Sequence, residues 1–140
     1  MLSAKTQYAC LAMLQLAHEH ASGEPVQVRR IAERHGIPLS FLVQILHDLK
    51  RAGLATSVRG AAGGYRLSRS PGELTLADVV EVFEPLETSA ECAAAQSPLA
   101  PAMSDVCSEL ARARSEQLRS LTLAELADRA ATHADSMWSI

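Results

Sequence analysis

Three cysteines, Cys10, Cys92 and Cys107, are the residues of this 140-residue chain best suited to redox chemistry or metal binding. Their spacing contains no CxxC pair, and three cysteines cannot form a complete disulfide framework. In a reducing compartment we expect them to be free thiols or ligands rather than structural disulfides. Cys10 lies in the broad apolar arc of a predicted helix, so we interpret it as a small buried hydrophobic residue.

The residue spacings typical of common enzymes do not occur in the sequence. We find no Ser, His and Asp pattern of a hydrolase, no HExxH, and no phosphate-binding glycine loop directly before a helix. The glycines between residues 60 and 64 lie between two predicted strands instead. Nothing supports a hydrolase built on one Cys and one His, and we therefore expect a protein that is not an enzyme.

Charged residues are distributed unevenly along the chain. Residues 1–70 hold nine Lys or Arg against four acidic residues, a balance of +5, whereas residues 71–140 hold four against twelve, a balance of −8. A basic half joined to an acidic half is typical of a polyanion-binding face joined to a separate module that does not bind. Chance asymmetry is the alternative.

Length and hydropathy point to a globular chain without a membrane segment. The sequence has no run of eighteen apolar residues, and its N-terminus lacks the basic region and uninterrupted apolar region of a signal peptide. We expect a cytoplasmic protein of one domain with an appended helix.

Three helices are predicted in the first half, over residues 3–21, 27–35 and 39–52. Gly36 stands where a left-handed residue would end the second helix, and Pro38 blocks its continuation. Two helices joined by such a tight turn, the second with a polar outer face, are typical of a helix-turn-helix. An ordinary three-helix bundle with a solvated face is the alternative. The apolar set predicted for the third helix is Phe41, Leu42, Ile45, Leu46 and Leu49.

A glycine-rich hairpin is predicted directly after these helices, with strands over 54–59 and 64–68. Thr75 and Asp78 then form a predicted capping box that begins a short helix. A loop over 85–101, a long helix over about 102–120 and a last helix to about residue 131 complete the prediction. The stripe predicted along the long helix is Met103, Val106, Leu110, Ala113 and Gln117.

The third helix is the candidate to enter a DNA major groove. Ser40, Val43 and Gln44 at its N-terminal end would reach base edges, and a glutamine amide can bond adenine through two hydrogen bonds. Ser40 and the helix N-terminus could also bind a phosphate. Arg59 and the glycines of the hairpin tip would approach the phosphate backbone or a minor groove. We interpret Arg30 as a residue on the solvated face of the second helix rather than as a DNA contact.

The run Arg59–Leu67, RGAAGGYRL, and the following Pro71–Val79, PGELTLADV, resemble the wing of the Rrf2-type winged helix-turn-helix regulators. This family includes an iron–sulfur cluster regulator, a nitrite-sensitive repressor and a cysteine-metabolism repressor. Residues 2–9, 31–38 and 122–126 are similar to it too. The resemblance implies a mostly α fold with a small β-hairpin, and a homodimer held by residues 102–120 that places two recognition helices on a near-palindromic operator in double-stranded DNA.

Domain bounds and DNA contacts follow from the helix pattern together with this resemblance. We expect a winged helix-turn-helix over 1–84, a loop in the family's sensor region over 85–101, and dimerisation and C-terminal helices over 102–140. The predicted DNA-binding residues are Lys5, Tyr8, Val28, Ser40, Phe41, Val43, Gln44, Arg51, Ser57, Arg59, Gly60, Gly63, Gly64 and Tyr65.

The sequence departs from the family in the cysteine pattern that binds the cluster. Members often hold an iron–sulfur cluster through three cysteines about five residues apart, whereas here fourteen residues separate Cys92 from Cys107. Cys92 stands where the first ligand is expected, and Cys107 does not fall on a ligand position. A cluster involving Cys92, with Glu91, His18, His20 or a partner chain completing it, a redox-active pair of Cys92 and Cys107, and no cysteine-based sensing remain open.

Two functions are thus compared. The first is a DNA-binding transcriptional regulator that acts as a repressor and responds to a redox, iron–sulfur or other small-molecule signal. The alternative is a winged-helix module for protein interaction without sequence-specific DNA binding. The alternative predicts that replacing Arg59 and Gln44 with alanine leaves function untouched.

Overall fold

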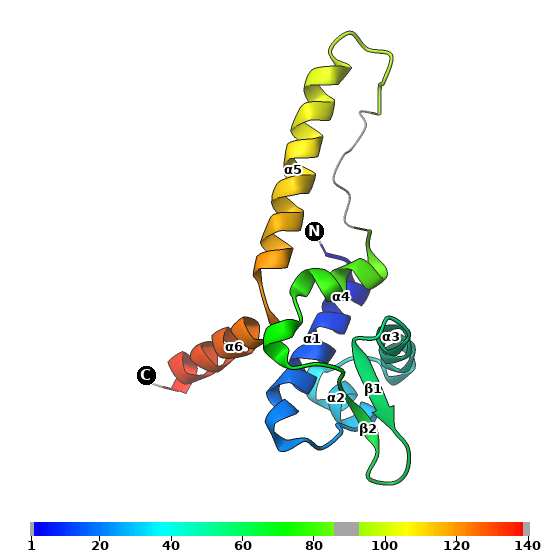
Figure 1. Cartoon of the computed structure of the whole chain (residues 1–140), viewed down its shortest axis with the longest axis vertical. Coiled ribbons are helices and arrows are strands. Elements are labelled where there is room, and N and C mark those ends of the chain that lie inside the picture. The colour runs from blue at the N-terminus through cyan, green and yellow to red at the C-terminus, as the bar shows by residue number, and fades with distance from the viewer. Residues whose placement is uncertain (1, 86–92, 139–140) are drawn as a thin grey trace.

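The computed structural model describes residues 2–85 and 93–138, the last four of them by their backbone alone. Helices dominate it, with one antiparallel hairpin, as the sequence predicts. A long helix, α5, stands out from the domain formed by the other elements (Figure 1). The elements are α1 (Ala4–His18), η1 (His20–Ser22), α2 (Val28–His35), α3 (Leu39–Arg51), β1 (Ala55–Val58), β2 (Gly64–Leu67), η2 (Pro71–Glu73), α4 (Leu76–Phe83), α5 (Ala100–Ser120) and α6 (Leu123–Trp138).

Helix α1 is the central element of the core. Ala9, Ala12 and Met13 are fully buried along it, and the helix packs against α3, α4 and α6. Alanines at these positions let neighbouring helices approach closely, while Met13 fills the space between them. The first helix is therefore largely buried, as its broad apolar arc indicates.

The turn between α2 and α3 has the geometry that its residues predict. Gly36 adopts φ +64° at the end of α2, and its backbone N–H donates to the Ala32 carbonyl. Such left-handed backbone favours glycine because a Cβ would crowd the carbonyl. Pro38 then directly precedes α3. The two helices of the predicted helix-turn-helix are thus placed as expected.

One apolar residue of α3 lies on a different face from the one predicted. Phe41, predicted both in the apolar set of this helix and among the DNA contacts, is 54% exposed. The other four residues of that set fall within a narrow arc of the helix, whereas Phe41 lies about a quarter turn away from the centre of that arc. The residues of α3 that are buried are Leu42, Ile45, Leu46 and Leu49.

The hairpin is anchored to the helices by an additional β-bridge. Strands β1 and β2 pair antiparallel, and Tyr65 of β2 also pairs with Val26, just before α2. A Cβ on Gly64 would lie 2.2 Å from the Val26 carbonyl oxygen, and one on Gly63 would lie 2.1 Å from the Val58 oxygen. These two glycines therefore permit a close approach of backbones, and we call the segment Ala55–Leu67 the wing.

Capping hydrogen bonds are present at the starts of α4 and α6, and α6 is longer than predicted. Both hydrogen bonds of the capping box between Thr75 and Asp78 are present at the start of α4. At Thr122 the hydroxyl oxygen accepts from the Glu125 backbone N–H. Helix α6 was expected to end near residue 131 but continues to Trp138. The segment contains no glycine or proline and is rich in alanine, so nothing in it ends the helix earlier.

Candidate nucleic-acid interface

The outer face of α3 presents apolar and polar groups side by side. Phe41 is 54% and Val43 51% exposed, and Ser40 and Gln44 are exposed beside them. Lys5 of α1, Ser40, Phe41 and Gln44 line one shallow hollow. Residues distant in sequence therefore form one surface, and all five belong to the predicted DNA-binding set. Arg51, another member of that set, is exposed at the C-terminal end of the same helix.

Polar contacts connect this surface to the supporting helices. The Gln44 side-chain Nε2 donates to Asp48 Oδ1 at 3.0 Å, one turn along α3. Lys5 Nζ lies 3.9 Å from Asp48 Oδ2 and 5.4 Å from the centre of the Phe83 ring of α4. Sequence reasoning did not single out Asp48, although its four-residue spacing from Gln44 on a predicted helix was a usable signal.

The wing exposes its turn while its base is packed. Ser57, Arg59 and Gly60 are exposed, and Gln27 Nε2 donates to the Ala61 carbonyl in the turn at 3.0 Å. Tyr65 is half-buried against the core. The exposed cation Arg59 is thus carried on a turn that is fixed to the segment before α2.

The remaining predicted contacts, Tyr8 and Val28, are half-buried and pack against the core. Arg30, interpreted as solvated, is an ion-pair partner of Glu19, with 2.6 Å between Nη1 and Oε1. Its side chain is 58% exposed, so this pair contributes little to stability.

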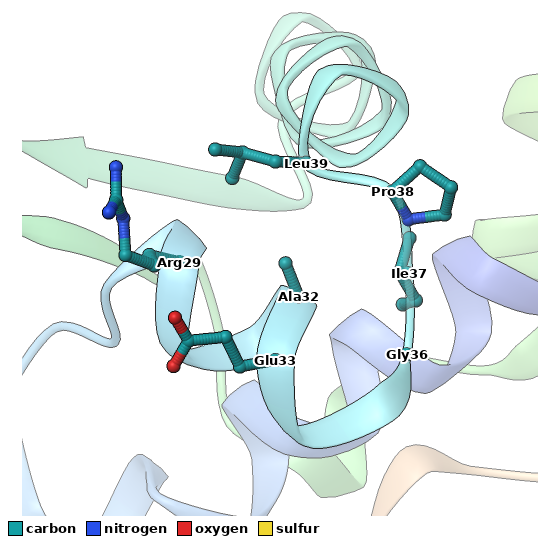
Figure 2. A pocket seen from close by; sticks show the side chains of 7 residues that line it. All are labelled: Arg29, Ala32, Glu33, Gly36, Ile37, Pro38 and Leu39. Carbon is teal, nitrogen blue, oxygen red and sulfur yellow. The ribbon is translucent and has the colours of Figure 1, made fainter.

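A second hollow lies at the turn of the helix-turn-helix. Figure 2 shows Arg29, Ala32 and Glu33 of α2 on one side and Pro38 and Leu39 on the other. The hollow measures about 520 Å³ and is open to solvent. It places an arginine and a carboxylate beside the N-terminal end of α3.

A polar pair links α1 and α2. His35 is half-buried, and its Nε2 lies 2.9 Å from Gln15 Oε1. Because an amide oxygen only accepts, Nε2 carries the proton of this bond. Burial, with Arg34 adding to it, lowers the pKa of His35. The structure brings these two side chains together because α2 crosses the buried face of α1.

The described cysteines do not form a ligand set. Cys10 is buried in α1, where burial, with Glu84 adding to it, raises its pKa to about 11. Cys107 is half-buried in α5, and Cys92 and Glu91 lie outside the described residues. Within residues 2–85 and 93–134, no three His, Cys, Asp or Glu side chains gather as a metal site would require. The described side chains of one chain therefore do not by themselves supply the ligands of an iron–sulfur cluster.

Helix α5 has an apolar stripe that the described chain leaves uncovered. Met103, Val106 and Leu110 are 52%, 46% and 65% exposed. One turn beyond Leu110, the helix is tied to the domain by Arg114, whose Nη2 lies 3.4 Å from Glu84 Oε1. Glu84 also accepts from the Ser3 backbone N–H at 3.1 Å, so this carboxylate joins the start of α1 to α5.

A helix-turn-helix followed by a two-stranded wing, with exposed side chains along the second helix, defines a winged helix-turn-helix protein. Comparison with known proteins specifies the class further. The Rrf2 family, described as iron-dependent transcriptional regulators, matches residues 2–129, and the chain belongs to this family. It is a transcriptional regulator rather than an enzyme, as predicted.

Individual relatives agree with this assignment. The chain is 34% identical to Protein rrf2 of Nitratidesulfovibrio vulgaris over 89% of its own length and 85% of that protein. It is 42% identical to the HTH-type transcriptional regulator IscR of Aliivibrio salmonicida, over 65% of its own length and 54% of that protein. The chain thus spans only about half the length of several relatives that it matches.

Solved structures share the fold over nearly the whole chain. CymR, the global cysteine regulator of B. subtilis, matches with a TM-score of 0.82 and 31% identity, covering 92% of this chain and 97% of that one. T. potens IscR matches with a TM-score of 0.76 and 33% identity, covering 93% and 88%. No helix among the described residues is long and apolar enough to cross a membrane.

Proposed function

We propose that this Rrf2-family regulator is a repressor that binds a near-palindromic operator as a homodimer, with α3 in the major groove. The outer face of α3 carries this proposal, since Phe41 and Val43 are both more than half exposed beside Gln44. Exposed apolar groups on a helix suit thymine methyl groups, and the amide suits adenine. Lys5 beside them supplies a cation for the phosphate backbone.

The wing would act as a second contact with the backbone of the DNA. Arg59 is exposed on a turn, and Gly60 lets that turn approach a phosphate closely. In this proposal residues 1–84 form the DNA-binding unit and residues 85–101 connect it to the helices of residues 102–140. The basic balance of residues 1–70, which lie within this unit, supports its role in binding DNA.

Helix α5 would pair with its counterpart in a second copy. Its stripe of Met103, Val106 and Leu110 is apolar, lies on one face and is uncovered in the described chain. Apolar side chains at such spacing gain free energy when a partner helix removes them from water. Pairing two copies would set the two recognition helices on the two half-sites.

DNA binding is tested by selecting sequences from a random duplex library with the purified full-length protein. We expect a palindromic site whose affinity falls as salt rises, because bound Lys and Arg release counterions from phosphates. Arg59→Ala is expected to weaken binding to all sequences and to lower the salt slope by about one. Absence of any sequence preference at low salt would refute the proposal and favour a protein-interaction module.

Dimer formation is tested separately by sedimentation of Leu110→Ser. We expect a shift toward monomer and weaker binding to the full operator, while binding to a single half-site changes little. Arg112→Ser is the matched control, because Arg112 is exposed on α5 but lies away from the apolar stripe. Equal sedimentation of the two variants and the wild-type protein would show that α5 does not pair through this stripe.

The signal is a separate question from DNA binding. An iron–sulfur cluster involving Cys92, a thiol pair and a signal independent of cysteine each remain compatible with a regulator of this family. The absorption spectrum and iron content of protein purified without air distinguish the first from the others.

A further inference from the structure

We propose that Asp48 is a positioning residue that fixes the orientation of the Gln44 side-chain amide toward the DNA. Through this orientation, α3 would select adenine over guanine. The inference rests on the proposed function, since it assigns a specificity device within the same surface. It concerns a carboxylate on a face that is otherwise suited to a polyanion. Such a group repels phosphate, so its presence there calls for a structural reason.

The contact between Asp48 and Gln44 fixes the polarity of the amide. Nε2 of Gln44 donates to Asp48 Oδ1 at 3.0 Å. If the amide were rotated by half a turn, its oxygen would face the carboxylate oxygen, and two acceptors would meet without a hydrogen between them. A carboxylate accepts only, so it admits a single orientation of the amide. One N–H is thereby engaged, and the amide oxygen and the second N–H remain for the DNA.

This presentation matches the edge of adenine in the major groove. Adenine offers a donor at N6 and an acceptor at N7, which pair with an amide oxygen and an amide N–H. Guanine offers two acceptors, O6 and N7, so the amide oxygen would meet an acceptor. An amide free to rotate could instead turn an N–H toward guanine. Fixing the amide through Asp48 therefore excludes the orientation that guanine would accept.

Lys5, which also lies over the Phe83 ring, places a cation beside the carboxylate from outside α3. Lys5 Nζ lies 3.9 Å from the second carboxylate oxygen, Oδ2, and 5.4 Å from the centre of the Phe83 ring. The ammonium group offsets the negative charge that would otherwise face the phosphates. Lys5 belongs to α1 and Phe83 to α4, so the carboxylate that orients the amide has a cation from a second helix beside it.

The experiment compares base preferences of the wild-type protein with those of Asp48→Ala and Gln44→Ala in the full chain. The readout is the ratio of affinities for adenine and guanine at each position of the selected half-site. We expect one position where Gln44→Ala removes the preference for adenine. At that position alone, Asp48→Ala should lower the ratio about fivefold, the change that corresponds to one net hydrogen bond.

Two further variants separate positioning from charge and from folding. Glu33→Ala removes an exposed carboxylate from α2 without touching Gln44, and should leave the adenine-to-guanine ratio unchanged. Asp48→Asn keeps the shape of the side chain, but its amide can donate or accept. It should therefore also lower the ratio even if the alanine variant folds poorly. In a Gln44→Ala background, Asp48→Ala should have no further effect on the ratio.

The outcomes distinguish this inference from the proposed function. A wild-type protein that selects no sequence refutes both. A wild-type protein that selects an operator, with the adenine-to-guanine ratio unchanged in Asp48→Ala and Asp48→Asn, refutes only the assignment to Asp48. An equal loss of affinity for every base at every position in both Asp48 variants would also refute it, since that result reflects a general effect on the helix or the surface charge.

Discussion

Replacing Gly64 with alanine would disturb the bridge that ties the wing to the helix-turn-helix. The backbone of Gly64 adopts φ +153°, and an added Cβ would lie 2.2 Å from the Val26 carbonyl oxygen and 2.5 Å from the carbonyl carbon. Both atoms belong to backbone, which cannot turn aside as a flexible side chain would. The bridge between Val26 and Tyr65 must therefore open, or the wing must move away from the segment before α2.

The magnitude follows from the contacts that would be lost. Two hydrogen bonds hold the bridge, from the Val26 N–H to the Tyr65 carbonyl at 2.8 Å and from the Tyr65 N–H to the Val26 carbonyl at 2.9 Å. Each contributes about 1 kcal/mol to stability. Backbone strain in a non-glycine residue at this φ adds about 1 kcal/mol. We therefore expect Gly64→Ala to lower the free energy of unfolding by about 3 kcal/mol.

Urea denaturation followed by circular dichroism at 222 nm measures this change, at one protein concentration because pairing of chains would affect stability. Gly72→Ala is the matched control, since a Cβ there meets nothing within 4 Å and the backbone is not left-handed. It should change stability by less than about 1 kcal/mol. If the two variants had the same stability, the close approach of Gly64 to Val26 would not constrain the wing as we argue.

The other predictions concern titratable groups. The neutral ring of His35 is favoured by folding, because burial lowers its pKa below the ordinary 6.5, so stability should fall as the pH drops below about 6.5. His35→Gln should weaken this pH dependence of the urea midpoint, and an unchanged slope would contradict the assignment. Cys10, with its raised pKa, should resist iodoacetamide at pH 7.5 until the protein is unfolded, as mass spectrometry of labelled peptides would show, and rapid labelling in the native state would contradict its burial. Replacing Cys10 and Cys107 with serine should leave the iron content per chain at the wild-type value, because neither belongs to a described ligand group; a fall would show that one of them binds iron.

Local patterns in the sequence were sufficient for the helices, the turns and the hairpin. Gly36 and Gly53 both adopt left-handed backbone just after α2 and α3, where a side chain would be strained. The capping pair Thr75 and Asp78 lies three residues apart and needs no distant partner. The family could likewise be predicted from the run Arg59–Leu67, because its resemblance to the wing of the Rrf2-type regulators lies in one short continuous motif.

The candidate surface was predicted in part. Ser40, Val43 and Gln44 are exposed on α3 as the helix pattern predicts. Phe41 was placed both in the apolar set of the helix and among the DNA contacts, because its residue type favours burial; only the packing of α3 against its neighbours shows that it is exposed. The length of α6 was underestimated, since a helix without a stop residue gives no local indication of its end.

The sequence by itself determined the order of the main helices and the hairpin and most of their bounds, because capping residues, glycines and apolar spacing act within a few residues of one another. The tertiary structure decided which distant side chains meet. Lys5 reaches Asp48, and Gln15 reaches His35, only because α1 crosses both helices of the helix-turn-helix. Such contacts depend on crossing geometry, which is fixed by packing of the whole core and leaves no signal in the residues between them.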